Sequence, residues 1–551
     1  MSFKKALMGV GVSGALVVAI GMGVYAVPAM PGGNDGSAPG GAPGASSAAN
    51  ISRVGATSFT SGASESGKSY SSSTGGENAV LVSGGKVELN DVKIDKSGDE
   101  GDENSDFYGT NAGVLAYDNG ELVLKDATIT TNGGHANGVF AYGSGVIEIS
   151  DSMIQTSGNN SGGIMVTGGG SLTATDVKVE TAGNSSAAIR SDRGGGTMTI
   201  KDGSYKTTGV GSPAIYSTAN VTVEEAELEA TASEGVVIEG FNSVSLKGVE
   251  LTDTNTTLNG NSETYKNVFI YQSMSGDAEE GTGTFSAQDT EFTTNKGDTF
   301  FVTNTSAVIN LRNNTYHNND ANGAFLLAQT GKWGTSGQNG RQVSLNLDDD
   351  EVTGAITIDE ISSLELHLGE GSYLKGAMTG EGTKNVKIAD KESVWVLEGD
   401  VTLDFLEDAD ATFQNIYGNG HSLTVNGETV PINTGTAPEH KVGYQSAADV
   451  IKNNTVAKDC IGGADNEDCA GTIDDNKSTI IWFIIGGVAG VFVIAMIVGI
   501  VMMVQKRKRS ERGIKVTLNE NEMGRSNRRS GENENGRGDS RVDGGSGRRD
   551  R

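Results

Sequence analysis

Side chains that could bind a ligand recur at a nearly constant spacing in the first half of the chain. Equivalent positions lie 25 or 26 residues apart and carry Leu115 with Tyr117, Phe140 with Tyr142, Met165, Arg190 with Asp192, and Tyr216. An aromatic ring offers a broad apolar face with a polar edge, which suits sugars and protein partners alike. If these side chains share one outward face, they predict a surface that binds a partner protein or a polysaccharide.

Residues for catalysis form a weaker pattern. Enzymes that cleave glycans normally need several acidic residues on one face, either as a paired acid and base or together with calcium and a basic residue. Asp348, Asp349 and Asp350 form the one compact acidic cluster among the predicted strands. Neighbouring residues of a strand face opposite sides, so at most two of these carboxylates could act together, and we interpret the cluster as a solvated turn. The histidines show no metal-ligand spacing: His135, His317, His367, His421 and His440. We predict no catalytic residue and no metal site, with glycan cleavage kept as an alternative.

Two further groups could bind calcium or form a cross-link. The segment 98–106 is rich in carboxylates, but it lacks the glycine and the terminal glutamate of an EF-hand loop, so calcium is only an alternative to having no cofactor. Its acidic residues are Asp99, Glu100, Asp102, Glu103 and Asp106. Cys460 and Cys469 are the only cysteines, and we expect them to form a disulfide if this part of the chain is exported.

The elements that position these residues follow from one repeated phrase between residues 111 and 251. Val114, Val139, Ile164, Ile189 and Ile215 lie at steps of 25, 25, 25 and 26 residues, a period typical of stacked repeats. Within each repeat apolar residues alternate with polar ones, as strands require, and Gly, Asn and Asp separate the strands. The sequence predicts an all-β fold, a right-handed parallel β-helix with three strands in each coil of about 25 residues.

This fold decides where the candidate side chains point. If Val114 and Ala116 face the core, strand alternation turns Leu115 and Tyr117 outward, and the equivalent residues of later coils follow them. Two alternatives stay open. The segment 98–106 or the N-terminal segment could fold over this face, or the register could be shifted by one residue, which would turn the whole column inward.

Composition and charge exclude some partners. The chain has 81 glycines among 551 residues and only 6% aromatic residues, which favours strands joined by many turns. Residues 27–478 contain 25 Lys and Arg against 62 Asp and Glu, a net charge near −37, while residues 505–551 contain 14 against 8, near +6. A segment as acidic as 27–478 repels nucleic acid, so we expect no nucleic-acid partner.

The order of the segments predicts a single-pass protein of the cell membrane, with its β-helix outside the cytoplasm and a cytoplasmic C-terminal tail. A long apolar stretch followed directly by Lys506, Arg507, Lys508 and Arg509 fits a membrane helix with its basic flank inside. We predict these segments: 1–26, a signal peptide or N-terminal anchor helix; 27–76, a spacer and possible cap; 77–432, the β-helix; 433–478, a stalk with the cysteine pair; 479–504, a transmembrane helix; and 505–551, a basic disordered tail.

Several phrases resemble those of a known group of proteins. The segments 106–112 (DFYGTNA), 190–196 (RSDRGGG), 212–217 (SPAIYS) and 270–277 (IYQSMSGD) resemble bacterial cell-surface β-helix proteins described as adhesin-like. The segments 393–400 (SVWVLEGD) and 418–425 (GNGHSLTV) are similar to passenger domains of autotransporter-type adhesins. The resemblance covers roughly residues 70–430. It implies an extracytoplasmic adhesin, and it brings no established catalytic residues.

Together these patterns predict a membrane-anchored surface protein that binds a protein or glycan of a host or neighbouring cell without catalysis. A polysaccharide lyase or glycoside hydrolase on a pectin-lyase-like β-helix is the first alternative. A passive surface coat or spacer is the second.

Overall fold

A computed structural model describes residues 51–101 and 104–443. The chain divides into two compact units, Met1–Asn454 and Thr455–Arg551, and every described residue belongs to the first. The described residues form strands joined by turns, together with one helix of five residues, α2 (Asn104–Tyr108). The predicted all-β class is confirmed for this part of the chain.

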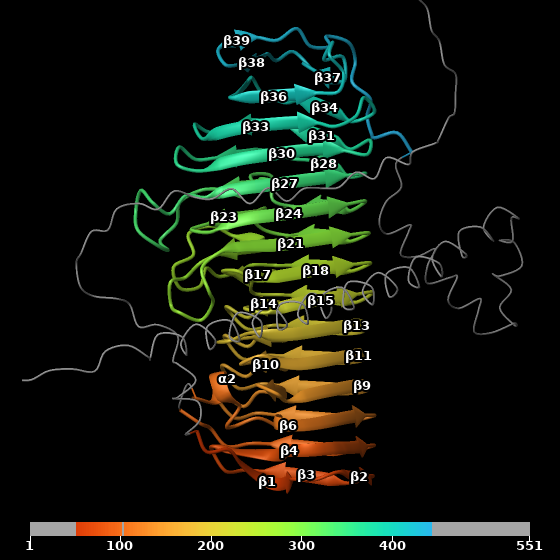
Figure 1. The fold of residues 1–551 in the computed structure, drawn as a ribbon, viewed down its shortest axis with the longest axis vertical. Coiled ribbons are helices and arrows are strands. Elements are labelled where there is room, and N and C mark those ends of the chain that lie inside the picture. The colour runs from red at the N-terminus through yellow and green to blue at the C-terminus, as the bar shows by residue number, and fades with distance from the viewer. Residues whose placement is uncertain (1–50, 102–103, 444–551) are drawn as a thin grey trace, which may run out of the picture. The chain divides into compact units, whose positions relative to one another are not determined.

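The strands recur in a fixed order and form three faces of a stack (Figure 1). The first face consists of β1 (Val54–Phe59), the first parts of β4 (Glu77–Asn90) and β6 (Val114–Lys125), β8 (Val139–Tyr142), β10 (Ile164–Thr167), β12 (Ile189–Ser191), β14 (Ile215–Ser217), β17 (Val236–Glu239), β20 (Lys266–Tyr271), β23 (Asp298–Thr303), β26 (Leu326–Ala328), β29 (Ile356–Ile358) and β32 (Met378–Thr379).

The second face continues from the bent strands. It consists of β2 (Ala63–Ser66), the later parts of β4 and β6, the first parts of β9 (Val146–Thr156), β11 (Gly170–Thr181) and β13 (Gly196–Thr207), then β15 (Asn220–Glu224), β18 (Ser243–Lys247), β21 (Thr282–Gln288), β24 (Ser306–Arg312), β27 (Gln342–Asp348), β30 (Ser363–Gly369), β33 (Thr383–Ile388) and β36 (Phe405–Asp408).

The third face completes each coil. It consists of β3 (Ser69–Ser72), β5 (Lys93–Lys96), β7 (Thr128–Thr131), the later parts of β9, β11 and β13, then β16 (Glu227–Ala230), β19 (Glu250–Asp253), β22 (Glu291–Thr294), β25 (Thr315–Asn318) and a separate four-stranded sheet of β28 (Glu351–Thr353), β31 (Tyr373–Gly376), β34 (Val394–Leu397) and β37 (Ile416–Tyr417).

Strands of successive coils pair in parallel, in the predicted register. Val114 pairs with Val139, Val139 with Ile164, and Ile164 with Ile189, and all of these side chains are buried. The apolar residues on the inner side of all three faces form one continuous core. The repeat needs glycine at its start for a steric reason. A Cβ on Gly138 would lie only 2.6 Å from the carbonyl oxygen of Gly163 in the next coil.

A single residue in the left-handed conformation makes the corner between the second and third faces. Asp126, Asp151 and Asp176 have φ angles of 51°, 50° and 52°, and aspartate tolerates this conformation better than most side chains. This corner explains why aspartate keeps the 25-residue step in the sequence.

The two ends of the stack differ from the prediction. The first coil begins at Val54, earlier than the predicted start at residue 77, because β1 and β2 pair with β4, and β3 pairs with β5. At the other end β35 (Val401–Leu403), β38 (Leu423–Val425) and β39 (Glu428–Thr429) form a small sheet with one antiparallel pair. The chain then returns along the stack, where His440 contacts Glu351 and Lys441 contacts Asp349.

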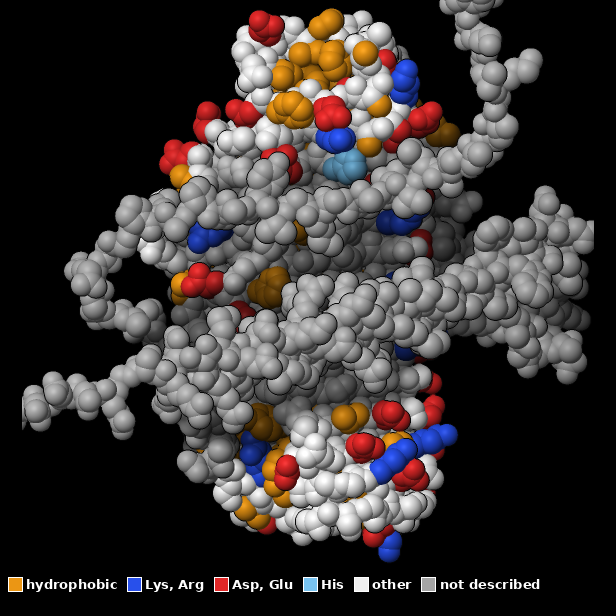
Figure 2. Space-filling view, viewed as in Figure 1, with side chains coloured by type: hydrophobic (Ala, Val, Ile, Leu, Met, Phe, Trp, Pro, Cys, Tyr) orange, Lys and Arg blue, Asp and Glu red, His pale blue; other side chains and the backbone are white. Residues whose placement is uncertain are grey.

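The surface is acidic on several coils, and apolar side chains gather at the end that carries β38 and β39 (Figure 2). Among the described residues no helix is long and apolar enough to cross a membrane. The predicted membrane segments 1–26 and 479–504, the tail 505–551 and the cysteine pair lie outside the described residues.

Candidate functional site

The outward side of the first face carries the candidate residues in one column. Parallel pairing aligns a single line of side chains from coil to coil: Leu81, Leu115, Phe140, Met165, Arg190, Tyr216, Val237, Phe269, Phe301 and Leu327. Tyr117 and Tyr142 lie two residues further along their strands. The predicted register is confirmed, and the alternative of a one-residue shift is excluded.

The prediction that this column is exposed is wrong: within it only Tyr216 and Leu327 are even partly exposed. Leu115 and Phe140 are 0% exposed, and Tyr117 and Tyr142 are half-buried. The segment that contains α2 lies over them, and Thr167 fixes it by donating from Oγ1 to the carbonyl oxygen of Phe107 at 2.7 Å. The alternative that an insertion folds over this face is therefore what the structure shows. Leu81, Ala112, Leu115, Phe140 and Met165 form a second small core.

Arg53 holds the edge of this covered region. Its guanidinium lies 4.2 Å from the ring centroid of Tyr142, 5.1 Å from that of Tyr117 and 5.9 Å from that of Tyr108. Its Nε donates to the carbonyl oxygen of Tyr108 at 2.9 Å. The tyrosines predicted to bind a ligand thus surround the cation that directly precedes the first coil, an arrangement worth ~1–2 kcal/mol when partly desolvated.

A buried ionic network anchors α2 to the column. Arg190 Nη1 lies 3.3 Å from Asp106 Oδ1, and Arg190 Nη2 lies 3.2 Å from Asp192 Oδ2. His135 Nδ1 lies 2.7 Å from the other carboxylate oxygen of Asp106. Burial disfavours the charged guanidinium, but Asp106 and Asp192 outweigh it and raise the pKa of Arg190. Arg190 and Asp192, predicted as an exposed charged pair, are 9% and 5% exposed and serve this network.

Three of the phrases singled out in the sequence meet at the same place. Arg193 Nε lies 2.5 Å from Asp277 Oδ1, and its guanidinium lies 3.7 Å from the ring centroid of Phe107. Three phrases far apart in the sequence, those that contain Asp106, Arg190 and Asp277, therefore fasten two insertions onto one face. Their residues stabilise the fold at this point.

Beyond the covered region the same column opens into an aromatic pocket. The pocket has a volume of about 310 Å³ and is lined by Tyr216, Phe269, Tyr271 and Trp333, with Glu234 at one side. The rings of Phe269 and Tyr271 stack at 4.4 Å between centroids, and Trp333 lies 5.2 Å and 5.3 Å from them. Asn259, Asn261 and Ser262 form a polar wall.

Glu239 fixes the two tyrosines of the pocket. Tyr216 OH donates to Glu239 Oε2 at 2.6 Å, and Tyr271 OH donates to the same oxygen at 3.1 Å. Burial, followed by the nearby Tyr271 and Glu239, raises the pKa of Tyr216 well above its ordinary value, and burial and Glu239 do the same for Tyr271. Both hydroxyls therefore keep their protons and hold the rings in place.

A buried ion pair supports the floor of the pocket. Lys266 is fully buried, with its Nζ 3.1 Å from Glu234 Oε1 and 4.4 Å from the ring centroid of Phe269. Burial lowers the pKa of Lys266, while Glu234 opposes this shift. Because each charge is buried, removal of either partner would leave the other uncompensated.

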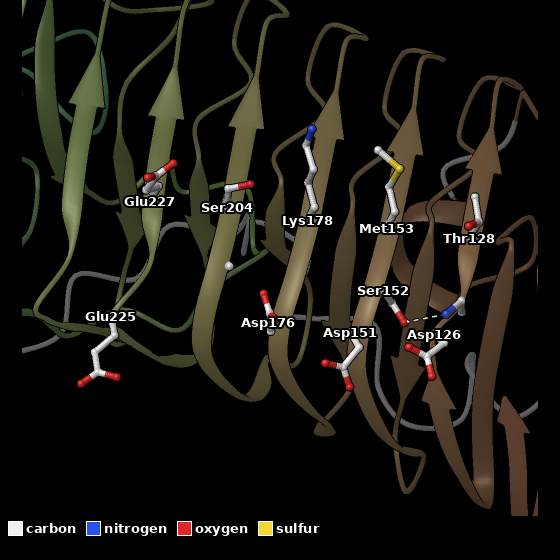
Figure 3. Close-up of a pocket in the computed structure, with 12 residues that line it drawn as sticks. Asp126, Thr128, Asp151, Ser152, Met153, Asp176, Lys178, Ser204, Glu225 and Glu227 are labelled. Carbon is white, nitrogen blue, oxygen red and sulfur yellow. Dashed lines mark hydrogen bonds between the residues drawn. The ribbon is translucent and has the colours of Figure 1, made fainter. Parts of the chain in front are cut away.

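An acidic recess of about 860 Å³ follows the corners between the second and third faces (Figure 3). Asp126, Asp151, Asp176 and Glu225 line it, but Figure 3 shows their carboxylates spread along the corners, not gathered on one point. Within residues 51–101 and 104–443, no group of three His, Cys, Asp or Glu side chains is placed to hold a metal ion. The backbone conformation of the corner accounts for these aspartates.

Asp99 and Asp350, two of the other acidic candidates, accept structural hydrogen bonds. Asp99 Oδ1 accepts a hydrogen bond from the backbone N–H of Gly134 at 2.7 Å, while Asp102 and Glu103 lie outside the described residues. The interpretation of residues 348–350 as a solvated turn is wrong for Asp350, which is fully buried and accepts hydrogen bonds from Asn314.

Of the rings that line the aromatic pocket, the sequence predicted only Tyr216 as a binding residue. Phe269 and Tyr271 continue the alternation that begins at Leu115, but insertions of unequal length, such as 254–265, separate the later coils and hide the constant step. Trp333 comes from an irregular loop, and no periodic pattern points to it. No protein-family model, curated protein or solved structure matches this chain.

Proposed function

We propose that this chain is an adhesin-like cell-surface protein whose right-handed parallel β-helix binds a glycan without cleaving it. In this proposal residues 479–504 anchor the protein in the cell membrane and the stacked coils project from it. The partner is a glycan on a host or neighbouring cell.

The aromatic pocket carries this proposal. Its volume of about 310 Å³ is at the lower end of the range for small-ligand sites, which suits one or two sugar rings. Tyr271 and Trp333 are half-buried, so a pyranose face could pack against them, while Asn259 and Asn261 offer amide groups to its hydroxyls.

Charge favours a neutral glycan. The segment that contains the stack carries a net charge near −37, and Glu234 lines the pocket itself. The acidic surface would repel an anionic polysaccharide. At physiological salt this repulsion is screened beyond ~8 Å, so it acts mainly on a chain that lies close to the surface. A neutral sugar avoids this repulsion.

The carboxylates around the pocket favour binding over hydrolysis. Glu239 accepts hydrogen bonds from two tyrosines, and Glu234 pairs with Lys266. A hydrolase needs one carboxyl as acid and a second as base or nucleophile, each able to reach the glycosidic bond. Both carboxylates are already engaged in structural contacts, which favours binding over cleavage. A lyase or hydrolase and a passive coat are the alternatives that the experiment distinguishes.

Replacing Trp333 with Ala tests the proposal. We expect the full-length chain to bind neutral glycans on an array saturably and without product. W333A should weaken binding at least tenfold, because one of the two rings proposed to pack against the sugar is lost. Phe405→Ala, which removes an exposed ring elsewhere, is the matched control and should bind as the wild type does. Product formation would establish the enzyme alternative, and an array without any binding would favour the passive coat.

A further inference from the structure

The turn beside the aromatic pocket contains a concentration of buried oxygen atoms without hydrogen-bond partners. Residues 253–267 run from the last residue of β19 into the start of β20, and Asn259, Asn261 and Ser262 among them form the polar wall of the pocket. Thirteen buried side-chain atoms in the described residues have no hydrogen-bond partner, and four of them lie in these fifteen positions. They are Asp253 Oδ1, Asn255 Oδ1, Thr264 Oγ1 and Asn267 Oδ1. All four are oxygen atoms.

The first of these residues breaks a pattern that earlier coils keep. The equivalent side chains Thr131, Thr156, Thr181 and Thr207 each donate from Oγ1 to a carbonyl oxygen across their own turn, at 2.5–2.6 Å. Parallel pairing continues this column through Ala230 to Asp253. Asp253 makes no such bond, since its Oδ1 has no hydrogen-bond partner among the described residues. Burial raises the pKa of its carboxyl to about 8, a shift that a bound cation would oppose.

The hydrogen bonds of the turn bring Asp253, Asn255 and Asn267 close to one another. The backbone N–H of Asn255 donates to Asp253 Oδ2 at 3.3 Å. Asn267 Nδ2 donates to Thr294 Oγ1 at 3.1 Å, and Thr294 is the strand partner of Asp253 in the next coil. Asp253, Asn255 and Asn267 are each at most 1% exposed.

The lysine of the turn does not satisfy these oxygens. Lys266 Nζ contacts Glu234 Oε1 at 3.1 Å, Ser262 Oγ at 2.5 Å and the carbonyl oxygen of Thr264 at 3.1 Å. An ammonium group has three protons, and these three contacts use them.

We propose that the 253–267 turn binds a calcium ion through the side-chain oxygens of Asp253, Asn255, Thr264 and Asn267. Carboxylate, amide and hydroxyl oxygens are ligands that hard cations prefer, and an irregular turn suits the flexible coordination of Ca²⁺ better than the strict octahedron of Mg²⁺. With a single carboxylate the affinity should be low, with a Kd on the order of 10⁻⁴ to 10⁻³ M, as in extracellular calcium modules.

Calcium would also fix the polar wall of the aromatic pocket, because Asn259, Asn261 and Ser262 lie within the same turn. Weaker glycan binding in EDTA is a consequence that rests on the proposed function. Calcium binding itself does not depend on the proposed function. It can be measured without a glycan, so its failure and the failure of glycan binding are distinguishable.

Thermal unfolding and terbium luminescence of the full-length chain test the site. We expect 5 mM CaCl₂ to raise the Tm over EDTA by about 1–3 °C, and we expect bound Tb³⁺ to show emission sensitised by nearby aromatic rings and displaced by Ca²⁺. Asp253→Asn should abolish both signals. Asp253→Thr restores the residue of the earlier coils and should fold without responding to calcium, which covers the case that D253N does not fold.

Asp176→Asn is the matched control, since it removes an exposed corner carboxylate and should keep the full response. A wild-type Tm that is equal in CaCl₂ and EDTA, or an undiminished response in Asp253→Thr, would overturn the site. An equal rise in MgCl₂ would show general screening of an acidic chain and would contradict it as well.

Discussion

At the scale of single residues, burial decides what a charged pair contributes. Lys86 and Glu88 lie 3.6 Å apart with more than half of each side chain exposed, whereas Arg190 bridges Asp106 and Asp192 with about 11% of its side chain exposed. Solvent screens the first pair, while the second holds α2 on the first face. Sequence spacing alone could not separate these two kinds of pair.

Replacing Arg190 with Met should lower the free energy of unfolding by roughly 3–5 kcal/mol, because two buried carboxylates lose their cation. Lys86→Met, the same change in the exposed pair, should cost about 0–1 kcal/mol. Urea unfolding followed by circular dichroism measures both. Equal effects of the two substitutions would show that the Arg190 network does not hold the insertion in place.

At the scale of elements, the regular strands were predictable and the insertions were not. Alternation and the 25-residue step placed Val114, Val139 and their equivalents in the core, because backbone pairing in parallel coils forces like residues to stack. Helix α2 has only five residues, too few for a helical period to be recognised. What covers the first face depends on the path of irregular segments, and so the aromatic pocket could not be derived from period alone.

Corners between strands can also bury a carboxyl group, and the alternation of apolar and polar residues does not predict which one. Asp350, at the corner between β27 and β28, accepts hydrogen bonds from Asn314 and from Tyr316 OH, and its backbone N–H donates to Ser372 Oγ. Burial raises the pKa of Asp350 to about 6, against the opposing effect of Tyr316, Asn314 and the backbone N–H of Glu351. This carboxyl is therefore harder to ionise in the folded chain than in the unfolded chain.

This shift predicts a pH dependence of stability. Below about pH 4 the carboxyl of Asp350 is protonated in both states; between about pH 4 and 6 only the unfolded state releases its proton, so the free energy of unfolding should fall by up to ~1.4 kcal/mol per pH unit. Above pH 6 this contribution should stay constant. Subtracting the urea midpoints of Asp350→Asn from those of the wild type at each pH isolates the effect, and a difference that does not change between pH 4 and 6 would contradict it.

At the scale of the described stack, each coil contacts only its neighbours, so stability should be a sum over coils provided that the register is kept. Residues 363–382 form one coil without a long insertion: Gln342 pairs with Ser363, and Ser363 pairs with Thr383. Removing these 20 residues brings Thr383 opposite Gln342 and preserves the inward direction of Val386 and Ile388, which are buried. We expect the shortened chain to remain folded and to unfold cooperatively.

Removing residues 363–381 instead should do more damage, although it deletes one residue fewer. The one-residue offset turns Val386 and Ile388 outward, and each loses ~1.5–3 kcal/mol of apolar burial. Comparing the urea midpoints of the two deletions with that of the wild type checks the argument. Equal midpoints would mean that the turn before β33 absorbs the offset, and that the constant step of the sequence reflects the length of the turns more than the packing of the core.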